Sequence, residues 1–208
     1  MEHVATSALV AFAALFPVVD PIGNVPAFMA LTGGMRRERQ QQARIATLIA
    51  AALLVTFFTL GHYLLSVFHV SLAAVETVGG LVIGFSGWQM VTAHPMARRH
   101  EARPGDDDVA FYPMAFPLLA GPGALALALG LTNRHDSYLD FVGWAIGIAS
   151  ICFVSYVFLR LAAPVAQRLG PKGIEVTSRM MGLIVLAIGA ELVFNGVALE
   201  FGIDVPPQ

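Results

Sequence analysis

The sequence predicts an all-α, polytopic membrane protein with six transmembrane helices arranged as two inverted three-helix repeats, in which the first and fourth helices are broken. Hydrophobic residues make up 57% of the 208 residues, charged residues make up 12%, and the mean hydropathy is +0.72. An ordinary soluble domain carries about 25% charged residues, so this chain has too few to cover a core with a solvated surface. The other two observations are six apolar runs of similar length and a motif that occurs twice.

Each of the six apolar runs comes close to or exceeds the roughly 20 residues that a helix needs to cross the hydrocarbon layer. Helices are expected because a helix satisfies its own backbone polar groups inside lipid. The predicted spans are residues 5–31, 43–65, 71–92, 113–132, 139–160 and 180–200. The expected parts of this single membrane domain, 1–208, are a first repeat (1–92), a cytoplasmic loop (93–112), a second repeat (113–200) and a short periplasmic tail (201–208).

The first run contains FPVVDPIGNVPAFMALT at residues 16–32, which places prolines, a glycine and a carboxylate inside an apolar helix. Proline removes a helical N–H group and clashes with the preceding turn. We therefore expect Pro21 and Pro26 to break this span, and Pro122 to break the fourth. Backbone groups freed in this way are tolerated only where they are buried in protein or line a wet cavity. The alternative is a helix that is merely kinked.

The fourth run repeats the motif of the first. It opens FPLLAGPGALALALGLT at residues 116–132, which lies on residues 16–32 at a shift of 100 without a gap. The third and sixth runs match at a shift of 102, GLVIGFSGWQMV on GLIVLAIGAELV. Three spans per repeat reverse the direction of the chain, so the repeats are expected to be inverted. Transporters built in this way bind their solute near the midplane, where broken helices meet.

Polar residues inside the predicted spans are the candidates for function. A carboxylate at the centre of a membrane helix costs ~2.5–3.5 kcal/mol on insertion scales. Asp20 has two open roles, as the N-cap of the second half-helix or as a direct contact of the solute. Glu191 lies in the middle of the last span, and we expect it to carry a proton because burial disfavours its charged form. The candidate solute- or ion-binding residues are Asp20, Gly23, Asn24, Gly121, Gly123, Glu191 and Asn195.

The positions of the cations predict the orientation. With six spans, Arg134 is the one Lys or Arg on the same side as the termini, and the others among the twelve lie on the opposite side. Cytoplasmic loops carry the excess of Lys and Arg. The Arg-rich loops are therefore expected in the cytoplasm and both termini in the periplasm. Glu76, close to the outer end of the third span, is expected at the interface with water.

No sequence feature indicates an enzyme. A nucleophile elbow, an HExxH motif, a P-loop and a nucleotide fingerprint are all missing, so we expect no catalytic residues and no cofactor. Segment 94–108 has two His and three Asp without a standard ligand spacing, and we expect no metal site. Cys152 is the single cysteine, which excludes an internal disulfide. The expected partners are the lipid bilayer, a small-molecule solute and protons, with no nucleic acid; the sequence leaves oligomerisation open.

Three motifs in order give the chain a resemblance to the MarC family. They are DPIGNVPAF followed by ALT, AFPLLAGPGA after DDDVAF, and RMMGLIVLAI with a later NG, and the resemblance covers residues 4–200. It implies a bacterial inner-membrane protein of six spans, grouped with the LysE-like exporters, and a small-solute efflux fold without an assigned substrate. Family members carry Asn or Asp at position 20, and many carry Gln where this chain has Glu191. The positions that match the family motifs are Asp20, Pro21, Gly23, Asn24, Pro26, Pro117, Gly121, Pro122, Gly123, Ala124, Arg179, Gly182 and Gly196.

Three functions follow as hypotheses. The first is a secondary transporter that exports a small solute, in which one repeat rocks against the other around the midplane site. The second is a non-transporting scaffold whose glycines form a helix-association face; these are Gly79, Gly80, Gly84 and Gly87. The third is an intramembrane enzyme that uses Asp20 and Glu191 for acid–base chemistry, although no activated nucleophile accompanies them.

Overall fold

The chain folds into packed helices, and no strand occurs in the residues that the computed structural model describes, namely 2–33, 38–92, 109–132 and 138–203. In chain order the elements are α1 (Glu2–Val19), α2 (Asn24–Leu31), α3 (Arg39–Phe68), α4 (Leu72–Thr92), the π-helical η1 (Ala110–Leu119), α5 (Pro122–Thr132), α6 (Tyr138–Arg160) and α7 (Ala162–Glu200). The predicted all-α membrane fold is confirmed. Much of the predicted cytoplasmic loop and the end of the predicted tail lie outside the described residues.

Three of these helices, α3, α6 and α7, are long and apolar enough to cross a membrane. Counting each of two bent helix pairs as one span, α1 with α2 and η1 with α5, raises the number to five. The third predicted span, α4, is not among them, because polar residues such as Glu76 and Gln89 lower its hydropathy. The count of six spans and the inverted repeat therefore stay predictions.

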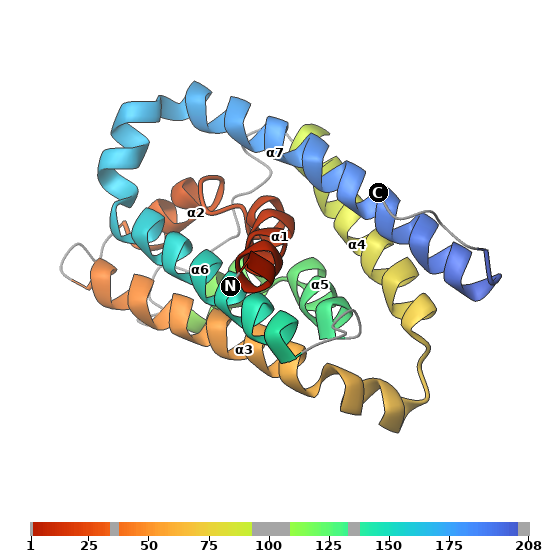
Figure 1. Cartoon of the computed structure of the whole chain (residues 1–208). Helices are drawn as coiled ribbons and strands as arrows, with labels where there is room; N and C mark the ends of the chain where they lie inside the picture. The colour runs from red at the N-terminus through yellow and green to blue at the C-terminus, as the bar shows by residue number, and fades with distance from the viewer. Residues whose placement is uncertain (1, 34–37, 93–108, 133–137, 204–208) are drawn as a thin grey trace.

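Four elements, α1, α3, α5 and α6, pack together as a bundle in which α1 lies against α6 and α5 lies against α3 (Figure 1). Glycines in α6 permit the first contact. A Cβ atom at Gly147 would lie 2.5 Å from Ala11 Cβ and 2.7 Å from a backbone oxygen of α1. Ser7 Oγ also donates a 2.8 Å hydrogen bond to Asp140 Oδ1. The register of α1 on α6 is thus fixed by a close approach and a polar contact.

The other large contact joins α4 to α7, which run antiparallel along one edge of the molecule (Figure 1). A Cβ atom at Gly80 would lie 2.6 Å from the carbonyl oxygen of Gly189, and one at Gly87 would lie 2.6 Å from the backbone nitrogen of Leu186. Small residues let membrane helices approach in this way. The glycines that suggested a face for an external partner are therefore largely used inside the chain.

Two elements differ from their predictions in more than the position of an end. The helix α7 starts at Ala162 rather than at residue 180, and it is kinked at Gly170, where φ is 64° and ψ is 171°. The segment that was assigned to a loop is thus helical on both sides of a sharp bend. The fourth span starts at Ala110 rather than at 113, and its first part is irregular because Pro113 and Pro117 cannot donate backbone hydrogen bonds.

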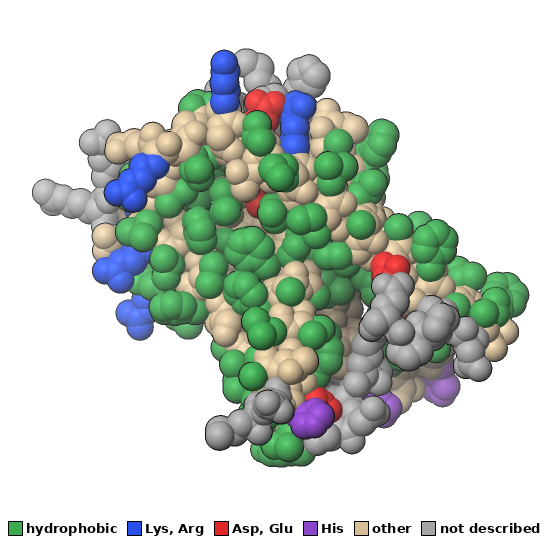
Figure 2. Space-filling model, turned by 45° about the horizontal axis from the view of Figure 1, so that its top comes forward, with side chains coloured by type: hydrophobic (Ala, Val, Ile, Leu, Met, Phe, Trp, Pro, Cys, Tyr) green, Lys and Arg blue, Asp and Glu red, His purple; other side chains and the backbone are tan. Residues whose placement is uncertain are grey.

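Cationic and apolar side chains occupy different parts of the surface. Figure 2 shows apolar side chains over most of the face in view, with Lys and Arg side chains at its upper and left margins. Among the described residues these cations lie at the start of α3, at the end of α6 and in the first half of α7. They are Arg39, Arg44, Arg160, Arg168, Lys172 and Arg179. One end of the helices is therefore basic, as the positive-inside rule expects of a cytoplasmic side.

A pair of glycines in α4 tests the close contact with α7. We expect Gly87→Ala to destabilise the protein by about 1–3 kcal/mol, because its Cβ meets backbone that cannot move aside. Gly84→Ala is the matched control: its Cβ has nothing within 4 Å, and the alanine should be neutral or stabilise the helix by up to about 1 kcal/mol. Thermal unfolding of the detergent-solubilised variants, monitored by size-exclusion chromatography, gives the melting temperatures of both. Equal melting temperatures would contradict the packing.

Candidate functional site

The first break separates α1 from α2, which are bent by 54°. Helix α1 ends at Val19, and Asp20 follows in the left-handed region with φ 44°. The Asp20 side chain is buried, and its Oδ1 accepts a 2.9 Å hydrogen bond from the backbone N–H of Gly23. Asp20 thus accepts a hydrogen bond from a freed N–H in the turn before α2. The N-cap position of α2 itself is Gly23, and no side chain caps it, so Asp20 is not the N-cap that was expected. Its second expected role, contact with a solute, stays a prediction.

The second break separates η1 from α5, which are bent by 60°. The helical hydrogen bonds end with Ala120, whose N–H donates to the carbonyl of Ala115 at 2.8 Å. Gly121 follows, and α5 begins at Pro122. A proline at the first helical position loses nothing, because its N–H would have no helical partner there.

The positions of the breaks correct part of the prediction. Pro21 lies in the turn between α1 and α2, as expected for a residue that interrupts a helix. Pro26 instead lies within the first turn of α2, and Pro122 begins α5. These two prolines start the second half of each span rather than break it, because the first turn of a helix tolerates a missing N–H.

The two breaks meet inside the protein. The buried Asn24, at the start of α2, donates from Nδ2 to the carbonyl oxygen of Val19 at 2.8 Å and to that of Leu118 at 3.3 Å. One amide group therefore serves a carbonyl at the end of α1 and another at the end of η1. On the other side, a Cβ atom at Gly123 would lie 3.4 Å from Val18 Cγ1. Residues about 100 positions apart thus form one centre.

The helices α4 and α7 cover this centre. A Cβ atom at Gly23 would collide with the Asp20 carboxylate and would lie 2.7 Å from Ser178 Oγ of α7. A Cβ atom at Gly123 would lie 2.8 Å from Ile83 Cγ1 of α4. Gly23 has an ordinary helical φ of −66°, so space, and not backbone conformation, is what requires glycine there.

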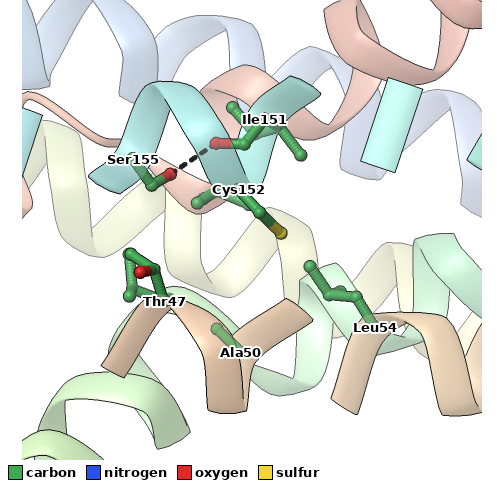
Figure 3. A pocket seen from close by; sticks show the side chains of 8 residues that line it. Thr47, Ala50, Leu54, Ile151, Cys152 and Ser155 are labelled. Carbon is green, nitrogen blue, oxygen red and sulfur yellow. Dashed lines mark hydrogen bonds between the residues drawn. The ribbon is translucent and has the colours of Figure 1, made fainter. Parts of the chain in front are cut away.

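A small cavity adjoins both breaks. Its volume of about 10 Å³ is close to the least that a single water molecule needs. Val19 and Leu119, the last residues of α1 and η1, lie on its wall. Helices α3 and α6 supply the other walls, shown in Figure 3. The lining side chains carry no charge; they are Val19, Thr47, Ala50, Leu54, Leu119, Ile151, Cys152 and Ser155.

Two of the lining residues carry hydroxyl groups. Thr47 Oγ1 donates to the carbonyl of Ala43 at 2.8 Å. Ser155 Oγ donates to the carbonyl of Ile151 at 2.8 Å, as Figure 3 shows. A hydroxyl that donates to its own helix keeps lone pairs with which it can accept. The accessible surface of the cavity is nevertheless apolar, because the two hydroxyl oxygens lie behind it.

Two candidate residues from the sequence lie elsewhere. Glu191 is exposed and Asn195 is half-buried on α7. Ser178, the residue of α7 beside the first break, precedes Glu191 by thirteen positions, or about 20 Å of helix. The structure therefore brings together the candidates at the two breaks, Asp20, Gly23, Asn24, Gly121 and Gly123, but neither Glu191 nor Asn195. Whether Glu191 carries a proton stays a prediction.

Sequence reasoning missed several residues of this centre. Ser178 fell in the segment assigned to a loop, and Thr47 and Ser155 are single hydroxyls in apolar runs without a pattern to distinguish them. Glu76, expected at the interface with water, is in fact buried with 4% of its surface exposed. In the part of the chain that the structure describes, no group of three or more His, Cys, Asp or Glu is arranged to hold a metal ion.

The Asn24 side chain offers a test of how the breaks are joined. We expect Asn24→Ala to destabilise the protein by about 1–3 kcal/mol, since the carbonyl oxygens of Val19 and Leu118 lose a donor in a setting without water. Asn195→Ala, on the half-buried face of α7, should stay within about 0.5 kcal/mol. Unfolding curves in detergent compare the two, and equal losses would show that the Asn24 bridge has no special weight.

Comparison with known proteins gives matches along nearly the whole chain. A family model described as MarC family integral membrane protein matches residues 5–201. The UPF0056 membrane protein YvbG of Bacillus subtilis is 29% identical, with 89% of this chain and 91% of the relative covered. The UPF0056 membrane protein MJ1677 of Methanocaldococcus jannaschii is 32% identical, with 91% and 95% covered. The UPF0056 inner membrane protein MarC of Citrobacter koseri is 27% identical, with 88% and 90% covered. No solved structure matches.

Proposed function

The chain belongs to the MarC family of integral membrane proteins, and from this premise we propose that it is a secondary transporter that exports a small solute past the two broken spans. The observation that carries the proposal is the meeting of the two breaks through Asn24, beside a cavity whose wall includes the last residues of α1 and η1. Non-helical backbone at membrane depth is tolerated where it is buried or lines a cavity. In secondary transporters such breaks form the solute site.

The centre combines an apolar cavity with polar side chains close to it. The accessible surface of the cavity is apolar, and the hydroxyl groups of Thr47 and Ser155 belong to residues that line it. Binding pockets commonly combine an apolar lining with a few polar groups that orient the ligand. The buried Asp20 directly follows the lining residue Val19 in the chain. In this proposal Asp20 shapes the break by accepting the hydrogen bond from Gly23 and also faces the path of the solute.

Location and orientation are part of the proposal. A relative from Citrobacter koseri is named an inner membrane protein, and we place this chain in the bacterial inner membrane. The basic end of the helices, with Arg39 at the start of α3 and Arg160 at the end of α6, faces the cytoplasm by the positive-inside rule. Both termini then face the periplasm.

A scaffold without transport activity has less support. It rested on glycines as a face for another protein, but Gly80 and Gly87 contact α7 and Gly79 contacts α5. An enzyme has little support as well, because Asp20 and Glu191, the pair that it would use, lie far apart. We retain transport as the function to test.

Alternating access predicts that the cavity opens to water from either side of the membrane. The single cysteine, Cys152, lines the cavity, so we expect a membrane-impermeant cationic methanethiosulfonate to modify it from both sides of proteoliposomes. The matched control is Phe153→Cys in a Cys152→Ala chain. Phe153 is 66% exposed on the outer face of α6, and a thiol there should stay unreactive because lipid excludes the reagent. Reaction of Cys152 from one side only, or from neither, would argue against alternating access.

Solute flux tests the proposal directly. Proteoliposomes preloaded with alanine, lysine, glutamate or glycerol should take up the labelled form of at least one of them by counterflow. We expect Thr47→Trp to reduce this uptake by about tenfold or more, because the indole is larger than the cavity and blocks it. Its neighbour gives the control: Leu48 is 58% exposed on the outer face of α3, and Leu48→Trp should retain uptake. Equal uptake by both variants would exclude the cavity as the path.

A further inference from the structure

We propose that α4 and the second arm of α7, residues 171–200, move together as one rigid body against the other helices, about hinges at His69 and Gly170. This inference rests on the proposed function, for which it supplies the moving parts. The sequence suggested that one repeat rocks against the other. The structure groups the helices differently, because the moving body takes one helix from each half of the chain.

The rigidity of the α4–α7 pair comes from backbone contact. A Cβ atom at Gly182 would lie 3.1 Å from the carbonyl oxygen of Gly87, and one at Gly80 would lie 2.6 Å from that of Gly189. Further along the same contact, a Cβ atom at Gly196 would lie 2.6 Å from the backbone nitrogen of Thr77. Helices that touch through backbone at several levels cannot slide or roll without a steric clash.

The hinges lie where the pair connects to the bundle. His69 ends α3 in the left-handed conformation, with φ 53° and ψ 36°, and α4 begins three residues later at Leu72. Gly170 divides α7 with φ 64° and ψ 171°, a region that is essentially restricted to glycine. The first arm of α7 follows α6 after the single residue Leu161, and this short connection keeps the arm with the bundle. Hinges are expected at element ends that absorb a large change of φ and ψ.

The two hinges occupy matching places in the two halves. Residues 69 and 170 are 101 positions apart, between the shifts of 100 and 102 at which the sequence motifs align. Each one joins the second predicted span of its half to the third. At Gly170 a Cβ atom would have nothing within 4 Å, so packing does not require the glycine. Its backbone conformation does.

The boundary between the pair and the bundle passes through the two breaks. Ser178 of α7 faces Gly23 in the first break, and Ile83 of α4 faces Gly123 at the second. A rotation of the pair would therefore change the space at both breaks at once. It would also leave the contact of α1 with α6 unaltered. Motion of this kind changes access to the centre from each side.

Distances between spin labels test the proposal without any solute. Labels are attached to cysteines at exposed positions of the full chain in lipid nanodiscs, in a Cys152→Ala background. We expect two distance populations between the pair and the bundle, measured from Leu183 of α7 to Phe153 of α6. One population is expected within the pair, from Val78 to Leu183, and one within the bundle, from Leu48 to Phe153. A single narrow population from Leu183 to Phe153, or equal widths for all three, would overturn the proposal.

Hinge variants assign the motion to these residues. We expect Gly170→Ala to change the ratio of the two Leu183–Phe153 populations by about fivefold or more, because alanine disfavours φ 64° with ψ 171°. Gly173→Ala, in the helix three residues on, should leave the ratio unchanged. If Gly170→Ala does not fold, His69→Gly replaces it and should broaden the Leu183–Phe153 distances alone. Equal effects of Gly170→Ala and Gly173→Ala, or no effect of His69→Gly, would contradict the assignment of these residues as hinges.

The outcomes for motion and for transport are separate. Two populations without tracer uptake from the four preloaded solutes would contradict transport and leave the hinged pair in place. Uptake with a single population would contradict the hinged pair and leave transport in place.

Discussion

The structure depends on one constraint: backbone groups that a broken helix frees inside lipid must find partners within the protein. The carboxylate of Asp20 accepts a hydrogen bond from Gly23, and the amide of Asn24 donates to carbonyls at the ends of α1 and η1. Two neighbouring polar groups in the first break thus serve backbone in both breaks. This sharing draws the breaks together and places them in the interior of the molecule.

A second constraint follows from the first, because groups that must be shielded from lipid need close cover. At each break, a glycine lets the covering helix approach closely. Gly23 admits α7, through Ser178, and Gly123 admits α4, through Ile83. Each break is covered by a helix from the other half of the chain. The two halves therefore exchange their last helices, and neither half could bury its own break alone.

Features with a local cause could be predicted from the sequence. Both breaks lie within a few residues of their predicted positions, because the effect of proline and glycine on a helix hardly depends on the rest of the fold. Features that depend on packing could not be predicted in this way. The position of Glu191 can be predicted only when it is known which face of α7 contacts other helices. The burial of Glu76 requires the same knowledge for α4. The kink at Gly170 was hidden because a charged, Gly-Pro-containing segment resembles a loop.

The exchange of helices limits how the molecule can change shape. If the first half moved as a unit, α4 would separate from α7, and the backbone contacts of Gly80 and Gly87 would be lost along their whole length. If α4 and α7 move together, those contacts persist, and the changes are confined to a boundary where side chains such as Ser178 and Ile83 face glycines. Side chains can repack at such a boundary, whereas touching backbones cannot. The motion that keeps α4 on α7 therefore requires less free energy, and it changes the structure where the broken spans meet.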